Sequence, residues 1–319
     1  FRGFESLSLR HFNYIIVLLR FNMYKNLKFI FEQILNYFLY KFLKKKIKYH
    51  VKKYPNITAR VFDVINLKIN LNGRLENNEL QVLKKKVFEK VGFKNFNALD
   101  IGANIGNHSI FFSDYFNHVF AFEPLSINYD LLKINSKLRK NISIFKIAAS
   151  DKDEERFMSI PSDIDLGHSV IVENNEKIEN NKEKIETKNL DIFLKKNNIK
   201  NIKFIKIDVE GFEFKVLRGL KETLSIEKPI IAFEQFPVDF KNNSTKSINF
   251  LKEQNYNFFY EPIFVDRKKS ANKIVNMIYK IFFFVQIVFS VKKIEFSLKK
   301  IEKFKIKPYP MIVASIDRL

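Results

Sequence analysis

A glycine loop that directly follows a short apolar run is the feature that most constrains the fold of this chain. The run Phe96–Asp100 favours a β-strand, and it continues into the loop Asp100-Ile-Gly-Ala-Asn-Ile-Gly106. Gly102 and Gly106 permit a tight turn and a close approach of a ligand to the backbone, because glycine has no Cβ. A strand that ends in such a loop is typical of Rossmann-like folds, in which the loop meets a nucleotide-type cofactor.

Apolar runs and amphipathic segments alternate along the chain beyond this loop. The pattern predicts strands at 96–100, 118–122, 142–148, 204–208, 229–233, 256–260 and 311–316, and helices at 108–116, 127–139 and 212–224. Such alternation is typical of parallel sheets whose crossover connections are helices. We therefore expect an α/β, Rossmann-like fold with a mostly parallel seven-stranded sheet and helices on both faces.

The sequence outside this alternation predicts extensions and insertions. Residues 1–53 indicate a basic, amphipathic helical extension with one or two helices within 11–46. Residues 54–94 indicate a hairpin, signalled by alternation over 60–72 that ends at Asn72-Gly73, and then a helix at 75–91. The main domain is expected at 95–319, with insertions at about 154–190 and 262–310. Within these insertions we expect a solvated loop at 173–188 and an interfacial or buried helix at 274–291, which is too polar to span a membrane.

An acidic residue after the second expected strand helps to define the cofactor. Glu123 lies 23 residues after Asp100, a spacing at which a carboxylate can accept hydrogen bonds from ribose hydroxyls. Asp100 would repel a pyrophosphate, but it can pair with the amino group of a methionine-type cofactor. Tyr129 and Lys133 have the spacing used by short-chain dehydrogenases, but they fall too early in the chain to face a nicotinamide. A nucleotide-dependent oxidoreductase is therefore the weaker alternative.

Four segments together resemble the FkbM family of methyltransferases. They are Ala98-Leu-Asp-Ile-Gly-Ala-Asn-Ile-Gly-Asn-His-Ser109, Phe122-Glu-Pro124, Thr187-Lys-Asn-Leu-Asp191 and Ile205-Lys-Ile-Asp-Val-Glu-Gly211 with Glu213. The resemblance covers about residues 97–260. It implies a class I methyltransferase fold, S-adenosylmethionine as the methyl donor and O-methylation, often of a sugar hydroxyl.

The same resemblance implies which residues bind the donor. The methionine end would be held by Asp100, Gly102, Asn104 and Gly106, the ribose by Glu123, and the adenine side by Ala148. Ala103 and Pro124 are further cofactor-binding candidates from the same two motifs.

A hydroxyl is a weak nucleophile, so an O-methyltransferase usually needs a base or a metal near the acceptor. Asp208, Glu210 and His168 are the candidate catalytic residues. Each has a structural alternative, since Asp208 can orient the donor, Glu210 can cap the next helix, and His168 can be a structural hydrogen-bonding residue. The Asp208-x-Glu210 spacing could hold a divalent ion, but no other clear oxygen ligands accompany it, so no metal is expected. Glu234, after the fifth strand, can face the acceptor or pair with a lysine.

The formal charge of +21 is concentrated at the two ends of the chain. Residues 1–53 hold 12 Lys and Arg against Glu5 and Glu32, and residues 267–308 hold 12 against Glu295 and Glu302. The remainder is close to neutral, so it offers no basic groove, and no nucleic-acid partner is expected. The basic ends suit either an anionic membrane surface or packing against protein.

These observations set the expected partners and location. The acceptor is expected to be a saccharide or another hydroxyl-bearing compound. The chain is expected to be cytoplasmic, with peripheral attachment to the inner membrane face left open. A non-catalytic membrane-surface protein is the second alternative. The absence of cysteine excludes disulfides and thiolate chemistry.

Overall fold

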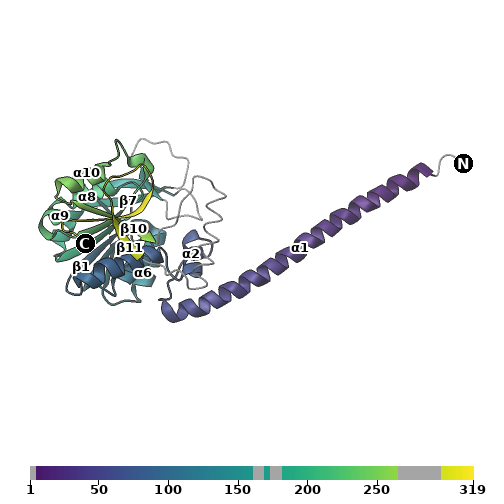
Figure 1. Ribbon diagram of the computed structural model, residues 1–319, viewed down its shortest axis with the longest axis horizontal. Helices are drawn as coiled ribbons and strands as arrows, with labels where there is room; N and C mark the ends of the chain where they lie inside the picture. The colour runs from purple at the N-terminus through teal and green to yellow at the C-terminus, as the bar shows by residue number, and fades with distance from the viewer. Residues whose placement is uncertain (1–4, 161–168, 173–181, 265–295) are drawn as a thin grey trace. The chain divides into compact units, whose positions relative to one another are not determined.

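The computed structural model describes residues 5–160, 169–172, 182–264 and 296–319. Two compact units make up the chain: Phe1–Tyr54 with Asn70–Gly73, and Pro55–Ile69 with Arg74–Leu319. All strands of the described ranges belong to the second unit, which is therefore the α/β part of the protein (Figure 1).

A single helix, α1 (Glu5–Lys53), forms most of the first unit (Figure 1). Phe31 and Phe38 share one side of this helix at about 100° per residue, and both are 65% exposed. Phe29 and Tyr40 lie on the opposite side and are also exposed. The prediction of an amphipathic helix is therefore wrong for this part of α1, where apolar side chains surround the axis. None of the helices in the described ranges combines the length and apolarity that crossing a membrane requires.

The segment 60–72, for which the sequence predicts a hairpin, contains helix α2 (Val64–Asn72) instead. Asp63 stabilises the start of α2, because its Oδ1 accepts a hydrogen bond from the backbone N–H of Ile65 at 2.7 Å. Gly73 follows the last residue of α2 in the left-handed conformation, with φ of 80°, as is common after helices. The Asn72-Gly73 signal therefore marks the end of a helix and not a hairpin turn.

An eight-stranded sheet forms the centre of the second unit, in the order β11-β10-β12-β9-β8-β1-β2-β3. The strands are β1 (Asn97–Ile101), β2 (His118–Phe122), β3 (Ile142–Phe145), β8 (Ile202–Ile207), β9 (Ile230–Gln235), β10 (Phe258–Phe264), β11 (Phe296–Lys300) and β12 (Tyr309–Ser315). Five neighbouring strands, β3, β2, β1, β8 and β9, run parallel to one another. β12 runs antiparallel to both of its neighbours, β9 and β10. The predicted mostly parallel sheet is confirmed, but it has one strand more than expected. The extra strand, β11, comes from the expected insertion at 262–310 and pairs antiparallel with β10.

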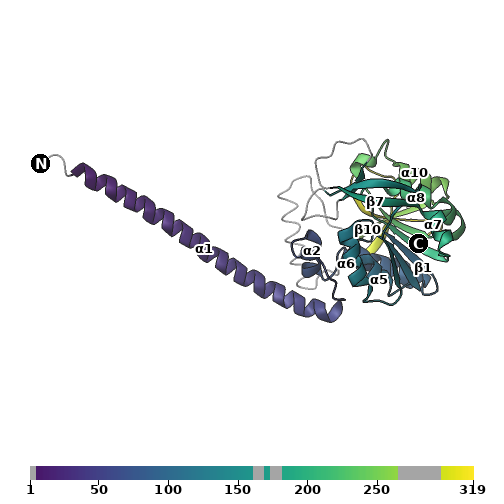
Figure 2. The same cartoon turned by 180° about the vertical axis from the view of Figure 1, so that it is seen from behind.

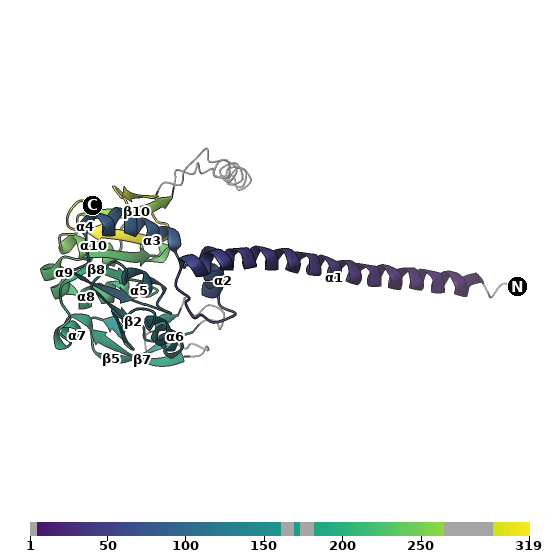
Figure 3. The ribbon, with the colours of Figure 1, turned by 90° about the horizontal axis from the view of Figure 1, so that it is seen from below.

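Helices cover both faces of this sheet (Figures 2 and 3). One face carries α3 (Asn77–Leu83), the π-helical turn η1 (Lys84–Phe88), α4 (Glu89–Val91), α5 (Asn107–Phe112) and α6 (Ser126–Ser136). The other face carries α7 (Leu190–Lys196), α8 (Glu213–Gly219), α9 (Lys221–Glu227) and α10 (Lys246–Glu253). Successive strand residues point to opposite faces, so Ala98 contributes to the core under α3 and α5 while Leu99 contributes to the core under α7 to α9. The segment expected as one helix at 212–224 is thus two helices, and the short 3-10 helix η3 (Pro237–Asp239) precedes α10.

A second, four-stranded sheet has the order β4-β7-β5-β6. Its strands are β4 (Ala148–Ser150), β5 (Glu154–Ser159), β6 (Val170–Val172) and β7 (Lys182–Asn189). The prediction of a solvated loop is wrong for 182–188, because this charged stretch alternates with the buried Ile185 and Thr187 and pairs antiparallel with β5. Residues 173–181 and the helix predicted at 274–291 lie outside the described residues.

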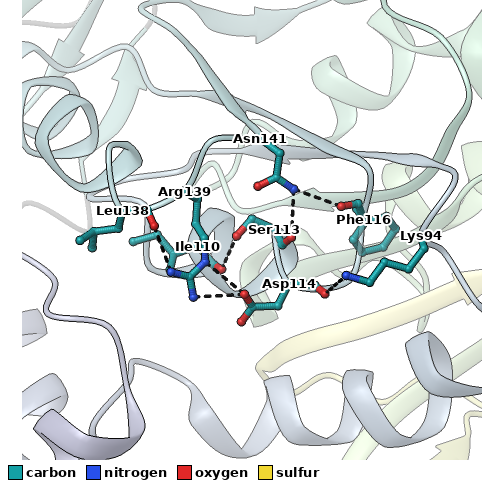
Figure 4. Close-up of polar contacts among 8 residues, drawn as sticks. All are labelled: Lys94, Ile110, Ser113, Asp114, Phe116, Leu138, Arg139 and Asn141. Atoms are coloured by element: carbon teal, nitrogen blue, oxygen red, sulfur yellow. Dashed lines mark hydrogen bonds and ion pairs between the residues drawn. The ribbon is translucent and has the colours of Figure 1, made fainter.

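A polar network holds the end of α5 beside the amino ends of β2 and β3 (Figure 4). The side-chain amide of Asn141 donates to the carbonyls of Ser113 and Phe116 at 3.0 and 3.2 Å. Arg139 pairs with Asp114 at 3.1 Å. Carbonyls at a helix end need partners outside the helix. This network supplies them and fixes the amino ends of β2 and β3, away from the carboxyl ends of the parallel strands.

Candidate active site

A cavity lies at the carboxyl ends of β1, β8 and β9. β1 pairs with β2 on one side and with β8 on the other, so the order of the strands along the sheet changes direction at this point. Ligands bind at such a switch point in open α/β sheets. The cavity is lined by Val64, Ile65, Lys68, Leu75, Glu76, Ile101, Gly102, Ala103, Asn104, Ile105, Asn107, His108, Phe122, Glu123, Pro124, Leu125, Asn128, Ile147, Ala148, Ala149, Met158, Ser169, Ile171, Asp208, Val209, Glu210, Phe212, Glu234 and Phe236.

Gly102 brings the glycine loop against the end of β8. Its φ of 79° is left-handed, and a Cβ at this position would lie 1.8 Å from the backbone oxygen of Asp208. Ala103 and Asn104 continue the cavity wall. Gly106 is also left-handed, with φ of 88°, but it is not among the lining residues. The loop therefore contributes to the cavity through 102–104, whereas Gly106 turns the chain into α5.

Glu123 follows β2 and holds the glycine loop in place. Its Oε2 accepts a hydrogen bond from the backbone N–H of Asn104 at 2.9 Å, and its Oε1 accepts one from the N–H of Leu125 at 2.9 Å. Burial raises the pKa of Glu123 to about 7, although the two backbone hydrogen bonds oppose the shift. Each carboxylate oxygen has a second lone pair, so Glu123 can still accept hydrogen bonds from a ligand.

Asp100 does not reach the cavity, contrary to the expectation that it holds the methionine end of a cofactor. The side chain of Asp100 is fully buried, and its Oδ2 accepts a hydrogen bond from Ser109 Oγ of α5 at 2.5 Å. It lies on the same face of the sheet as Ala98 because it is two residues along the strand. The structure therefore places Asp100 beneath the loop and against α5.

Lys206 is buried beside Asp100 on the adjacent strand. Its Nζ lies 2.6 Å from Oδ2 of Asp208. Burial opposes a charged amine, but the charges of Asp208, Asp100 and Glu76 outweigh it and raise the pKa of Lys206 above its usual range. In the sequence analysis, Lys206 appears only as a member of the motif Ile205–Gly211, with no role of its own. The signal that could have identified its role is a lysine within the apolar run Phe204–Ile207, just before Asp208.

Three carboxylates meet at the ends of β8 and β9. Side-chain oxygens of Asp208, Glu210 and Glu234 all lie within 4.8 Å of one another, and all three residues line the cavity. Burial and then the nearby charge of Asp208 raise the pKa of Glu234 to about 10, so Glu234 is a neutral acid at pH 7. Such a group of oxygens can exchange a proton with a ligand and has ligand atoms suited to a divalent cation.

A further carboxylate comes from the segment before the glycine loop. Glu76 lines the cavity, and its Oε2 lies 3.2 Å from His108 Nε2 of α5. The sequence predicts neither residue as a partner of the other. Glu76 comes shortly after Gly73 and the segment 60–72, for which the sequence predicts a hairpin. Its position beside the glycine loop depends on helix α2, which forms in that segment instead.

Three predicted site residues remain: Pro124, Ala148 and His168. Pro124 and Ala148 line the cavity. Ala148 belongs to β4, so the second sheet supplies one wall. His168 lies outside the described residues, and its neighbour Ser169 is a lining residue.

The parallel sheet, with its glycine loop at the switch point and the reversed β12 between β9 and β10, has the class I, Rossmann-like methyltransferase fold. Residues 100–258 match the family model described as the Methyltransferase FkbM domain. Residues 100–258 are therefore a Methyltransferase FkbM domain, as the sequence motifs predict.

Several solved structures are similar to this chain. An FkbM methyltransferase from Methylobacillus flagellatus KT is 19% identical, with a TM-score of 0.34 over 55% of this chain and 44% of that chain. Precorrin-6y C5,15-methyltransferase from Geobacter metallireducens GS-15 is 13% identical, with a TM-score of 0.38 over 75% and 88%. TYW2 of M. jannaschii, crystallised in complex with AdoMet, is 11% identical, with a TM-score of 0.33 over 77% and 78%. This chain thus spans less than half of the FkbM structure's length, and a comparison with curated proteins gave no match.

Proposed function

We propose that this protein is an S-adenosylmethionine-dependent O-methyltransferase that acts on a hydroxyl of a saccharide-type acceptor. The observation that carries the proposal is a single cavity wall that joins the glycine loop and Glu123 to the carboxylates Asp208, Glu210 and Glu234. One side of the cavity suits a nucleoside, and the other suits a hydroxyl that must lose a proton. Family membership favours this reading over a nucleotide-dependent oxidoreductase.

The residues present fit S-adenosylmethionine. The absence of a Cβ at Gly102 lets the glycine loop lie against the end of β8, and residues 102–104 line the cavity there. Glu123 can accept hydrogen bonds from the two ribose hydroxyls. Ala148 and Leu125 offer apolar surface beside it for the base. When bound, S-adenosylmethionine supplies an electrophilic methyl group on a sulfonium.

The three carboxylates Asp208, Glu210 and Glu234 would bind and activate the acceptor hydroxyl. A sugar hydroxyl would donate a hydrogen bond to Asp208 or Glu210, and one of these carboxylates would take its proton. Lys206 keeps a positive charge next to Asp208 and positions that carboxylate. Carboxylate pairs also suit neutral, hydroxyl-rich acceptors, because each oxygen accepts hydrogen bonds from hydroxyl groups.

The affinity for S-adenosylmethionine is expected to rise about tenfold between pH 6 and pH 8. The raised pKa of Glu123, about 7, means that its carboxyl group must lose a proton before both oxygens can accept hydrogen bonds from ribose hydroxyls. The ionised fraction therefore increases through this range, and affinity increases with it. Isothermal titration calorimetry at several pH values measures the effect, and Glu123→Gln is expected to bind weakly with no such pH dependence.

Glu213→Gln is the matched control. Burial also raises the pKa of Glu213 to about 7, but Glu213 does not line the cavity, so this variant should keep the pH dependence of the wild type. A wild-type affinity that is constant from pH 6 to pH 8 would move the ribose away from Glu123. Failure of the wild type to bind S-adenosylmethionine would refute the proposal itself, and binding of a reduced nicotinamide dinucleotide would support the oxidoreductase alternative.

We also propose that α1 attaches the protein to an anionic membrane surface. Residues 26–53 contain eight lysines and one acidic residue, Glu32. The amino groups of Lys41, Lys44 and Lys53 lie 5.3 Å from the ring centroids of Tyr37, Tyr40 and Tyr49. Aromatic rings with an apolar body and a polar tip favour the membrane–water interface, and lysines extend from there to anionic head groups. The positive charge and the exposed aromatic residues therefore complement the same partner.

The triple substitution of Lys44, Lys45 and Lys46 by glutamine is expected to weaken binding to phosphatidylserine-containing vesicles roughly 100-fold, because each lysine near an anionic leaflet contributes about 1 kcal/mol. Co-sedimentation at low and high salt measures it. The same change at Lys195, Lys196 and Lys200, three exposed lysines of the second unit, removes equal charge and should have little effect. Equal losses in the two variants, or equal binding to neutral vesicles, would contradict a role for α1.

A further inference from the structure

We infer that Glu76, which precedes the family-matched domain, binds the α-ammonium group of the methionine moiety of S-adenosylmethionine. This inference rests on the proposed donor. It assigns a binding residue to a segment that lies outside the matched residues 100–258. The assignment follows from the position of Asp100, the geometry of Glu76 and the charge around it.

The expected partner of the ammonium group, Asp100, is withdrawn from the cavity. Its side chain is fully buried, it accepts a hydrogen bond from Ser109 of α5, and it is not a lining residue. Glu123 is engaged with the backbone of the glycine loop on the side toward β2. A ligand that carries an ammonium group over the glycine loop therefore needs another carboxylate.

Glu76 supplies a carboxylate at the start of α5. It lines the cavity together with Asn107 and His108, and its side chain is 27% exposed. The backbone is held there by Leu75, whose N–H donates to Asn107 Oδ1 and whose carbonyl accepts from Asn107 Nδ2, both at 3.2 Å. Arg74 is 5% exposed and stacks its guanidinium 4.6 Å from the centroid of the Phe111 ring. Three consecutive residues thus fix the segment to α5.

The backbone conformation of Glu76 is unusual for a residue with a side chain. Its φ of 48° is left-handed, a conformation that costs roughly 1 kcal/mol or more for a non-glycine residue. Strain of this kind persists where the surrounding contacts impose it, often at ligand sites. Here it presents the carboxylate to the cavity at the residue just before α3.

The charge around Glu76 keeps its carboxylate ionised. Burial alone would raise its pKa, but the contact with His108 and the charges of Lys206 and Lys68 outweigh burial and lower the pKa to about 2. The carboxylate is therefore ionised throughout the physiological range. It has about four lone-pair positions, so the contact with His108 leaves others for an ammonium group.

The test compares three ligands with Glu76→Gln by isothermal titration calorimetry. S-adenosylmethionine and S-adenosylhomocysteine both carry the ammonium group, whereas 5′-methylthioadenosine lacks the amino-acid part. We expect Glu76→Gln to bind the first two roughly 10- to 100-fold more weakly, as loss of a hydrogen bond to a charged group implies. Its affinity for 5′-methylthioadenosine should match that of the wild type, which also shows that the cavity is intact.

Glu79→Gln is the matched control, because Glu79 lies three residues further along α3 and does not line the cavity. It should bind all three ligands as the wild type does. Unchanged binding of S-adenosylmethionine by Glu76→Gln would overturn the inference, and so would an equal loss for 5′-methylthioadenosine, which would indicate a structural role. A loss for S-adenosylmethionine alone would overturn the ammonium assignment in favour of the sulfonium. A wild type that binds 5′-methylthioadenosine but not S-adenosylmethionine would refute the proposed function as well.

Discussion

Replacement of Gly102 by alanine is expected to lower the affinity for S-adenosylmethionine by more than about 100-fold. The new methyl group would lie 1.8 Å from the backbone oxygen of Asp208, so the glycine loop must move away from the end of β8. The moved loop would no longer meet the donor in the wild-type geometry, and a loss of about 3 kcal/mol of contacts corresponds to roughly 100-fold in affinity. The left-handed φ of 79° adds conformational strain of roughly 1–2 kcal/mol. Calorimetry measures the affinity, and thermal unfolding measures the accompanying loss of stability.

Gly92→Ala separates the close contact from the strain. Gly92 is also left-handed, with φ of 72°, but a Cβ there would meet nothing within 4 Å. This variant should lower the melting temperature by about 2–4 °C, the effect of about 1 kcal/mol in a domain of this size, and leave ligand affinity unchanged. Wild-type affinity in Gly102→Ala would show that the loop does not need its close approach to β8 in order to bind the donor.

The central sheet could be predicted because its strands are buried on both faces. Parallel strands of this kind are nearly continuous apolar runs, and Leu99 and Ile205 are recognisable for that reason. The strand β7 was not predictable in the same way, because most of its residues are charged and only Ile185 and Thr187 are buried. Its pairing with β5 decides its structure, and a long-range partner leaves little trace in a local window.

The segment before the domain shows how one local signal can have two structural meanings. Asn-Gly is common in hairpin turns, yet glycine is also common after the last residue of a helix. The decisive contact is the hydrogen bond from Ile65 N–H to the Asp63 side chain, which starts α2. With a helix in place of a hairpin, the chain continues to Glu76 beside His108, a contact that no spacing rule predicts.

The glycine-loop side of the cavity was more predictable than the side formed by the carboxylates. Gly102 and Asn104 have left-handed backbone conformations, and the Glu123 carboxylate accepts hydrogen bonds from backbone N–H groups. Both features require particular residue types at particular positions. The role of Asp100 was not predictable, because the pleat of β1 alone decides whether its carboxylate faces the cavity or α5. The meeting of Asp208 with Glu234 depends on the register of β8 and β9, which is a tertiary property.

Asp208→Asn is expected to lower kcat by about 100- to 10,000-fold, the usual contribution of a general base. Asparagine keeps the shape of the side chain but cannot accept a proton from the acceptor hydroxyl. The affinity for S-adenosylmethionine should change by less than about threefold, since the proposed contacts to the donor come from other residues. The measurement is the steady-state formation of S-adenosylhomocysteine with the saccharide that the wild type methylates best, together with calorimetry of the donor.

Glu234→Gln and chelation separate the roles that the three carboxylates can have. Because the pKa of Glu234 is raised to about 10, its side chain is already neutral at pH 7, and replacement by the neutral glutamine should reduce kcat much less than Asp208→Asn does. If Asp208 accepts the proton, treatment with EDTA should leave the wild-type rate unchanged, because Lys206 at 2.6 Å already balances the charge of Asp208. Activity that disappears with EDTA and returns with Mg²⁺ would instead make Asp208, Glu210 and Glu234 ligands of a cation. Equal kcat in Asp208→Asn and the wild type would exclude Asp208 as the base and leave Glu210 as the candidate among the described carboxylates.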